Sequence, residues 1–279
     1  MPLVTSKGLL LDAQKHGYAV GAFNVENMEM VMAVLAAAEE ASCPIIMQTT
    51  PGTIKYAGLD YYFANIRAAA ERSKLPVACH LDHGSSFELA MSAFRTGYTS
   101  IMIDGSQLPL EGNISLTKSV TDACHAGGVP VEGELGRVGG KEDDLEAGNV
   151  NPYTDPTEAV EFVQRTKVDS LAVGIGTSHG VYKGTPKVNV EVLSEIRAAV
   201  DVPLVMHGTS GVPDEQVADC IKRGICKVNY ATDLRIAFTD GVKAYIAEHP
   251  GQFDPKKYGT VAMERVKQYV LDRMKVLKG

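Results

Sequence analysis

Short apolar runs alternate with helical patterns along the whole chain. Eight runs are rich in β-branched residues and have the length of strands; they cover residues 19–25, 44–49, 76–83, 100–105, 129–136, 170–176, 203–208 and 225–231. Between them, apolar residues recur with helical spacing, as over 190–200 and 213–223. Near-continuous hydrophobic strands separated by helices indicate a parallel sheet that is buried on both faces.

Eight strands with no half left over predict closure into one α/β barrel, a (β/α)8 TIM barrel. An open, doubly wound sheet is the alternative, but no Gly-x-Gly-x-x-Gly run opens a helix after the first strand. The length of 279 residues suits a single barrel of about 250 residues, so residues 1–279 are expected to form one domain. We expect an extra N-terminal helix, and after about residue 248 a helical appendage that packs on the barrel or on a neighbouring subunit.

Two stretches interrupt this alternation. Residues 137–155 and 177–189 are polar, contain glycine and are long for connections within a barrel. Both follow strands that end in candidate ligands. Because long loops in compact domains are usually lids or binding loops, we expect both to lie over the mouth of the barrel.

Composition limits the classes of function. The chain carries 34 acidic and 27 basic side chains, a net charge of −7, and so has no basic footprint for nucleic acid. Its five cysteines are odd in number and show no Cys-x-x-Cys spacing, which suits a reducing compartment. No apolar stretch approaches the ~20 residues of a membrane span, and the N-terminus does not read as a secretion signal. We expect a cytoplasmic protein that contacts neither membrane nor nucleic acid.

Three histidines each close an apolar run and each precede a glycine. They are His83, His179 and His207. Functional groups at the C-terminal ends of strands meet at one mouth of a barrel. Three neutral imidazoles there would make an open zinc site with the fourth position free for a substrate oxygen. The alternative is three separate hydrogen-bonded loop histidines, but their shared context favours the metal site.

Several carboxylates accompany these histidines. Asp82 precedes His83, and both reach the mouth only if the strand turns at its end. From the residues alone, Asp82 is either a general acid/base or a carboxylate that orients an imidazole. Asp104 and Glu134 also end strands, and they are either further metal ligands or members of salt bridges.

The turns after the last two strands predict a phosphate site. Residues 208–211 and 229–233 each connect a strand to a helix, where backbone N–H groups and helix N-termini bind phosphate in many barrels. Gly180 and Lys183 could complete the cradle.

Taken together, these motifs resemble the class II, zinc-dependent ketose-bisphosphate aldolases. The similarity covers essentially the whole chain and is carried by HLDHG, VEGELGRVGGKEDD, GTSHGVYKG, MHG-x-SG and KVNYATD. The runs TPGT at 50–53 and TDP at 154–156, and the alanine at 231, look closer to tagatose-1,6-bisphosphate aldolases. Fructose-type members usually carry Asp or Asn where this chain has Ala231.

The resemblance implies the composition of the metal site. It makes His83, His179 and His207 the ligands of a catalytic Zn²⁺. It makes Asp104 and Glu134 carboxylates that can take the metal when it shifts. It also implies a monovalent cation, Na⁺ or K⁺, beside the phosphate.

The same resemblance implies the catalytic and substrate-binding residues. Asp82 becomes the acid/base on the C4 hydroxyl, Glu142 the base that exchanges the proton on the dihydroxyacetone phosphate carbon, and Asn229 the residue that steadies the enediolate. The remaining candidates would contact the phosphate or the rest of the sugar; they are Asn24, Thr50, Gly180, Lys183, Gly208, Thr209, Ser210, Ala231, Thr232 and Asp233.

The implied reaction is reversible aldol cleavage of a sugar phosphate, tagatose 1,6-bisphosphate being favoured, to dihydroxyacetone phosphate and glyceraldehyde 3-phosphate. The alternatives are fructose 1,6-bisphosphate and a substrate with a single phosphate, such as 2-deoxy-5-keto-gluconate 6-phosphate. The single-phosphate alternative stays open because Thr260 and Met263 stand where family members usually present an arginine to the second phosphate. The resemblance also implies a homodimer or homotetramer, with an accessory barrel subunit as a further partner.

Three other interpretations are less well supported. A Schiff-base mechanism needs a desolvated lysine at the mouth, and Lys227 has no obvious partner in the sequence. A non-catalytic, sugar-phosphate-binding or partner barrel should have lost ligands that this chain keeps. A metal hydrolase barrel would typically show His-x-His on its first strand. The other histidines receive only a structural interpretation; they are His16, His80, His125 and His249.

Overall fold

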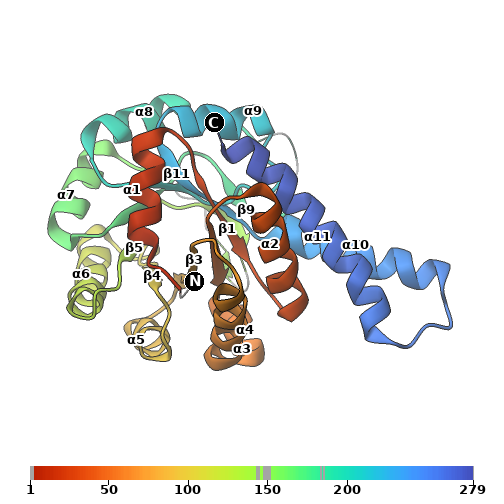
Figure 1. Cartoon of the computed structure of the whole chain (residues 1–279). Coiled ribbons are helices and arrows are strands. Elements are labelled where there is room, and N and C mark those ends of the chain that lie inside the picture. Colours follow the sequence, from red (N-terminus) through yellow and green to blue (C-terminus); the bar gives the residue numbers. More distant parts are fainter. Residues whose placement is uncertain (1–2, 143–144, 147–151, 183, 185, 279) are drawn as a thin grey trace.

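The computed structural model describes residues 3–142, 145–146, 152–182, 184 and 186–278, and of residues 141, 142, 145 and 146 it describes the backbone alone. Its centre is a closed barrel of parallel strands, as predicted (Figure 1). The strands are β1 (Val20–Asn24), β2 (Ile45–Thr49), β3 (Val77–Gly84), β4 (Ser100–Ile103), β5 (Val131–Leu135), β8 (Ser170–Val173), β10 (Leu204–Met206) and β11 (Ile225–Tyr230). β11 pairs with β1 and closes the ring.

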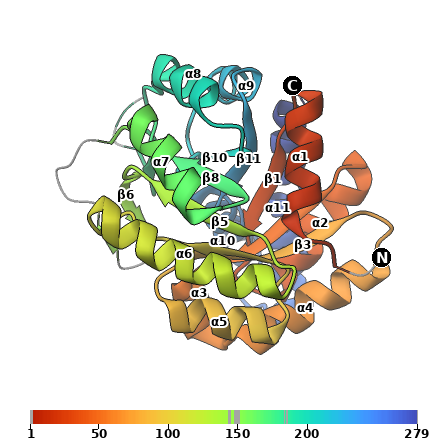
Figure 2. The same ribbon diagram turned by 90° about the vertical axis from the view of Figure 1, so that its left-hand side faces the viewer.

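Helices surround this barrel (Figure 2). They are α1 (Ser6–His16), α2 (Met28–Ala41), α3 (Pro51–Ala57), α4 (Leu59–Arg72), α5 (Phe87–Thr96), α6 (Leu110–Ala126), α7 (Pro156–Thr166), α8 (Val190–Ala199), α9 (Asp214–Lys222), α10 (Thr232–Glu248) and α11 (Pro255–Leu277). The architecture is therefore a (β/α)8 TIM barrel with an added N-terminal helix and C-terminal helix. Within the described residues, no helix combines the length and apolar character that a transmembrane span requires.

Alternation along the strands separates an apolar shell from a polar interior. In β3, Cys79 and Leu81 belong to the main hydrophobic core, while His80 and Asp82, on the other face, are buried among polar groups. Leu10 and Ala13 of α1 belong to a second, smaller apolar cluster with strand residues such as Ala78. Apolar packing of α1 thus closes one end of the barrel interior.

The C-terminal appendage packs on the barrel of its own chain, the first of the two alternatives considered above. Met274 and Leu277 of α11 are buried in the main core, and Ala19, directly before β1, donates its N–H to the Leu277 carbonyl. α10 and α11 run side by side and project from the barrel (Figure 1). Phe253, between these two helices, is 90% exposed.

The two long loops pair with one another. β6 (Gly139–Glu142) lies parallel to β9 (Ser178–His179) and antiparallel to β7 (Leu145–Glu146). This small sheet joins the loop after β5 to the loop after β8, so it ties together two connections that the sequence shows as independent.

Asp169 fastens α1 to the barrel, and its replacement by asparagine should destabilise the fold. The Asp169 carboxylate accepts from Lys7 Nζ at 2.9 Å, His125 Nε2 at 2.7 Å and the Val131 N–H at 2.8 Å. Burial raises the pKa of Asp169, but these hydrogen bonds outweigh burial and leave it below its ordinary value. Because Lys7 and His125 are partly exposed, the expected loss for Asp169→Asn at pH 7 is about 1–2 kcal/mol of unfolding free energy.

The pH dependence of this loss follows from the direction of the shift. A carboxyl whose folded-state pKa lies below its unfolded value stabilises the fold above the unfolded pKa, roughly 3.9, and loses that contribution as pH falls through the folded pKa. Urea unfolding of wild type and Asp169→Asn should therefore differ at pH 7 and converge below pH ~4. A difference that stays constant over this range would contradict the assignment.

Candidate active site

The three predicted histidines converge at the mouth of the barrel. His83 lies at the end of β3, His179 in β9 and His207 directly after β10. The centroid of the His83 ring lies 5.0 Å from that of the His179 ring and 4.7 Å from that of the His207 ring. One ring nitrogen of each histidine lies within 4.8 Å of a ring nitrogen of each of the other two. Closure of the barrel therefore brings together side chains that lie up to 124 residues apart in sequence.

The turn expected at the end of β3 is present. His83 adopts a φ of +49°, in the left-handed region that few non-glycine residues occupy. The pairing of β3 with β4 shifts register between Leu81 and Gly84. This local irregularity brings both Asp82 and His83 to the mouth, which regular alternation would prevent.

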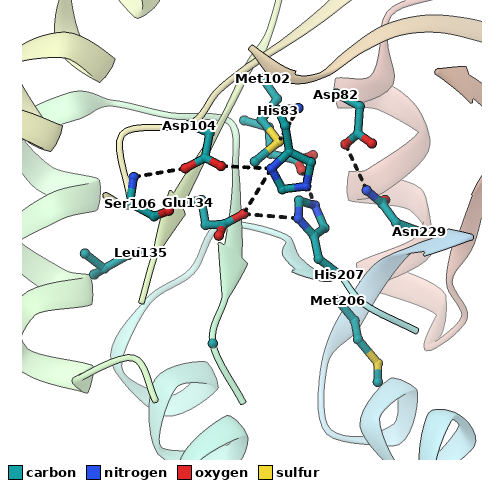
Figure 3. Close-up of polar contacts among 12 residues, drawn as sticks. Asp82, His83, Met102, Asp104, Ser106, Glu134, Leu135, Met206, His207 and Asn229 are labelled. Carbon is teal, nitrogen blue, oxygen red and sulfur yellow. Dashed lines mark hydrogen bonds and ion pairs between the residues drawn. The ribbon is translucent and has the colours of Figure 1, made fainter. Parts of the chain in front are cut away.

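Asp104 orients the ring of His83. Asp104 Oδ2 lies 2.9 Å from His83 Nδ1, and Asp104 Oδ1 accepts the Ser106 N–H at 2.9 Å (Figure 3). Although burial raises the pKa of Asp104, the hydrogen bonds from His83 and Ser106 hold it well below its ordinary value. The ionised carboxylate keeps a proton on Nδ1, so Nε2 is the His83 nitrogen suited to a metal.

His207 lies between two carboxylates. Its Nε2 lies 3.0 Å from Glu132 Oε1, and its Nδ1 lies 3.1 Å from Glu134 Oε2. Although burial lowers the pKa of His207, its contacts with Glu132 and Glu134 raise it to about 9. A metal ion that binds His207 at neutral pH must therefore displace a proton.

The residues present fit a metal ion. Three imidazoles that leave a fourth position open form a donor set that zinc uses in catalytic sites. His83, Asp104 and Glu134 form a second group whose ligand atoms also lie within 4.8 Å of one another. The structure thus places the two predicted alternative carboxylates beside the same histidine, on the opposite side of the rings from Asp82 (Figure 3).

Asp82 is held by amide side chains from three other strands. Its Oδ2 accepts from Asn24 Nδ2 at 2.8 Å and Gln48 Nε2 at 3.1 Å, and its Oδ1 accepts from Asn229 Nδ2 at 3.0 Å. Amide N–H groups can only donate, so this set engages both oxygens of the carboxylate as acceptors. Asp104 Oδ2 and Glu134 Oε2 lie 2.9 Å and 3.8 Å from His83 Nδ1, on the opposite side of the rings from Asp82. The geometry therefore favours the acid/base interpretation of Asp82 over the orienting one.

Two amide oxygens beside Asp82 offer further acceptors. Asn229 Oδ1 and Gln48 Oε1 are buried and accept no hydrogen bond from the described residues. Buried polar atoms are seldom left without a partner, and such exceptions need an explanation. A substrate hydroxyl would supply the missing donor to Asn229, whose Nδ2 is already engaged by Asp82.

A cavity at the N-terminus of α10 corresponds to the predicted phosphate cradle. It is lined by Asn24, His179, Gly180, Gly208, Thr209, Ser210, Asn229, Ala231, Thr232 and Arg235. The first turn of α10 presents backbone N–H groups, which together with the helix dipole favour an anion. Eight of the predicted substrate residues, counting Asn229, are therefore brought together here.

Two predicted substrate residues have other contacts. The Asp233 carboxylate accepts from the Gly211 N–H at 3.2 Å and the Tyr269 hydroxyl at 2.8 Å, so it connects the cradle to α11. Thr50 is buried and caps α3 through the Thr53 N–H. Lys183 and the side chain of Glu142 lie outside the part of the chain that the structure describes.

Replacing Gly208 by alanine should distort the cradle. Gly208 has a φ of +63°, and a Cβ there would lie 2.7 Å from the backbone C and O of Ser178. The left-handed conformation alone costs an alanine about 1–2 kcal/mol, and the contact forces the His179 loop to move. We expect a lower urea midpoint and a raised KM for the phosphorylated substrate. Gly251→Ala, whose Cβ would meet no atom within 4 Å, is the matched control and should change neither quantity.

Three buried residues that the sequence did not connect to the site lie beneath it. Lys227 Nζ lies 2.9 Å and 3.1 Å from the two oxygens of Glu132 and 3.3 Å from His80 Nε2. The expectation that Lys227 lacks a partner is therefore wrong, and His80 belongs to a buried polar cluster. Strands β3, β5 and β11 face one another across the barrel, and sequence spacing does not show which inward side chains meet.

Gln48 and Arg235 were also missed. Gln48 is the last inward-facing residue of β2, and Arg235 lies in the first turn of α10 beside Thr232. Arg235 Nε donates to Glu26 Oε1 at 2.7 Å, which fixes the arginine on the cavity wall. In the sequence, the one feature that could have indicated a role for Gln48 and Arg235 is that each lies two residues from a motif, Gln48 before Thr50 and Arg235 after Asp233.

Comparison with known proteins agrees with this geometry. The family model for class-II fructose-bisphosphate aldolase matches residues 4–279. The crystal structure of the YdjI aldolase from Escherichia coli K12 is 36% identical, with a TM-score of 0.87 over 99% of this chain and 97% of that chain. A candidate fructose-1,6-bisphosphate aldolase from Coccidioides immitis is 29% identical, with a TM-score of 0.88 over 97% of this chain and 94% of that one.

A third structure supports the fold alone. The fructose-bisphosphate aldolase of Campylobacter jejuni is 23% identical, with a TM-score of 0.83 over 99% of this chain and 95% of that one. The match of the family model over nearly the whole chain, together with the first two structures, shows an enzyme that cleaves carbon–carbon bonds. The chain is therefore an aldolase and belongs to the class II fructose-bisphosphate aldolase family.

Proposed function

We propose that this aldolase is zinc-dependent and reversibly cleaves a ketose 1,6-bisphosphate, with tagatose 1,6-bisphosphate as the favoured substrate. The products would be dihydroxyacetone phosphate and glyceraldehyde 3-phosphate. The observation that carries the proposal is the convergence of His83, His179 and His207 beside Asp82, whose carboxylate accepts from the amides of Asn24 and Asn229. When bound, zinc would supply Lewis-acid stabilisation of the negative charge that develops next to the carbonyl as the carbon–carbon bond of the sugar breaks.

The residues of the chain would divide the remaining work. Asp82 takes the proton of the C4 hydroxyl, and Asn229 Oδ1 accepts a hydrogen bond from a neighbouring substrate hydroxyl. The first turn of α10 and the Gly208–Ser210 turn bind the phosphate of the dihydroxyacetone half, with a Na⁺ or K⁺ ion beside it. Glu142 returns a proton to the carbon of that half, as the resemblance implies.

Support for tagatose over fructose comes from position 231. Ala231 lines the cavity next to Thr232, so this wall lacks the carboxylate or amide that fructose-type members usually present there. Fructose 1,6-bisphosphate is the nearest alternative, because the sugars differ only in the configuration of one hydroxyl.

A single-phosphate substrate is the second candidate, and α11 supports it. Family members usually present an arginine to the distal phosphate from this region, whereas here Thr260 Oγ1 donates to the Lys256 carbonyl and Lys256 Nζ pairs with Asp254. The Thr260 hydroxyl is thus engaged within its own helix, and the charge of Lys256 is paired with that of Asp254. Both groups offer a second phosphate less attraction than an arginine would.

We further propose that the enzyme is a cytoplasmic homodimer or homotetramer, with an accessory barrel subunit as a further partner. The projecting α10–α11 pair, which exposes Ile236, Ile246 and Phe253, supports self-association. Light scattering coupled to size exclusion would give the mass directly, and a monomer at micromolar concentration would contradict the proposal.

A coupled assay of dihydroxyacetone phosphate release tests the function. Tagatose and fructose 1,6-bisphosphate are compared side by side, with a chelator and after zinc is restored. We expect chelator-sensitive cleavage and a higher kcat/KM for tagatose 1,6-bisphosphate. A higher kcat/KM for the fructose sugar would make fructose the substrate, and no cleavage of either by zinc-loaded enzyme would reject the bisphosphate proposal in favour of a single-phosphate substrate.

A further inference from the structure

We infer that Lys227, Glu132 and His80 form a buried network that positions His207, so that its Nδ1 faces the metal. This inference rests on the proposed zinc dependence. The family comparison and the motifs assign none of these three residues a role. They are positioning residues, because they reach the metal site only through His207.

The network occupies the interior of the barrel below the three histidines. Lys227 and His80 are 0% exposed and Glu132 is 2% exposed, and they lie on β11, β3 and β5. His80 Nδ1 lies 2.7 Å from Ser100 Oγ, which in turn lies 2.7 Å from Ser6 Oγ of α1. Polar contacts therefore run without a break from the helix that closes the barrel up to a histidine of the mouth.

The ammonium group of Lys227 determines the direction of the hydrogen bonds around it. An ammonium can only donate, so the His80 Nε2 that lies 3.3 Å away must accept and carries no proton. The proton of a neutral His80 ring then lies on Nδ1 and is donated to Ser100. Both oxygens of Glu132 likewise accept from Lys227, so Glu132 is an ionised acceptor.

The same logic fixes the ring of His207. Glu132 Oε1 lies 3.0 Å from His207 Nε2, and an ionised carboxylate oxygen can only accept. Nε2 must therefore keep its proton, which leaves Nδ1, the nitrogen nearer Glu134 and His83, to coordinate the metal. A histidine ligand whose other nitrogen donates to a carboxylate is held in one tautomer and one orientation.

Stability alone does not account for the ion pair. Apolar side chains of similar volume often replace a buried ion pair with no loss of stability, because the charges lose their hydration. A Lys–Glu pair in a barrel interior is therefore better explained by what Glu132 does for His207. Lys227 balances the charge of Glu132, and Glu132 Oε1 stays available to the imidazole of His207. Lys227 therefore serves as a counter-ion and is not exposed as a nucleophile.

Two double variants separate this role from the stability of the fold. Glu132→Met with Lys227→Met removes both charges and the acceptor of His207, and it keeps apolar volume in the interior. Glu132→Gln with Lys227→Met also removes both charges but retains an amide oxygen that can accept from His207 Nε2. Neither leaves an uncompensated charge, and both alter the surroundings of His80 in the same way, so the acceptor is the informative difference.

Zinc affinity, measured without substrate by competition with a chromophoric chelator, is the main readout. The loss of an outer partner of a metal ligand typically costs ~10–100-fold in affinity. We expect that loss in the Met/Met variant, with kcat lowered and KM for the sugar phosphate unchanged. The Gln/Met variant should recover most of the affinity. The absorption spectrum of the cobalt(II) form should change in the Met/Met variant alone.

Two results of the zinc titrations would contradict the positioning role of the network. Equal zinc affinity in wild type and a folded Met/Met variant, or an equal loss in both double variants, would overturn the inference. Circular dichroism and urea midpoints establish that each variant folds, and Lys118→Met on the surface of α6 controls for the loss of a lysine. If the zinc affinities differ as expected but no sugar is cleaved, the proposed substrate fails while the network stands.

Discussion

Asp82→Asn is expected to lower kcat for sugar cleavage by about 10²–10⁴-fold, the range that positioned acid/base groups contribute. Asparagine has nearly the same shape as aspartate but cannot take the proton of the C4 hydroxyl. Its amide would also face one of the three N–H donors that now converge on the carboxylate. Since Asp104 and Glu134 contact His83 from the opposite side of the rings, zinc content should change little.

The comparison of kcat with metal content decides between the two roles considered for Asp82. Activity lost at constant zinc content agrees with proton transfer, whereas activity lost in proportion to zinc would make Asp82 an orienting carboxylate. A kcat within threefold of wild type would reject both. Asp122→Asn on α6, where the side chain is 64% exposed, is the matched control and should leave kcat and zinc content unchanged.

The barrel was predictable because its strands have a simple pattern. Buried parallel strands are apolar on most positions, and all eight were located from mainly apolar runs of six to eight residues. For two strands, the predicted C-terminal end lies beyond the observed one, because a glycine with positive φ follows the strand. Gly176 and Gly208 both have positive φ, so the predicted runs 170–176 and 203–208 end as Ser170–Val173 and Leu204–Met206.

The site was predictable at its rim and not in its interior. Residues that end parallel strands must meet at one edge, which is enough to bring His83 and His207 together. The pairing of Glu132 with Lys227 crosses the barrel, and it depends on strand tilt and side-chain length rather than on spacing. The parallel contact of Gly140 with His179 joins two loops, for which no periodic pattern exists.

The backbone conformation of His83 explains how Asp82 and His83 both reach the mouth of the barrel, which the sequence pattern alone did not show. Regular alternation directs Asp82 and His83 to opposite faces, and only the left-handed φ of His83 resolves the conflict. A histidine in this conformation is uncommon, so no propensity argument would place it there. The strain lies beside the proposed metal site, where backbone strain is often found in enzymes.

The largest expected loss of zinc follows from His83→Asn, because His83 alone belongs to both groups of candidate metal ligands. Asparagine tolerates the left-handed φ of this position and can still donate to Asp104, so the fold should persist while the imidazole is lost. Zinc affinity should fall by more than the ~10–100-fold that removal of an outer partner costs, and aldol cleavage should fall to background.

His179→Asn is the informative comparison, because it leaves His83, Asp104 and Glu134 in place. If these carboxylates form a second metal position, this variant keeps weaker zinc binding and loses cleavage, whereas His83→Asn loses both. Isothermal titration of each metal-free variant with zinc, beside His249→Asn as a distant control, measures the difference. Equal and complete loss in both variants would mean that the three imidazoles form one indivisible site. Unchanged zinc affinity in His83→Asn would place the metal elsewhere, since every candidate group among the described residues includes that ring.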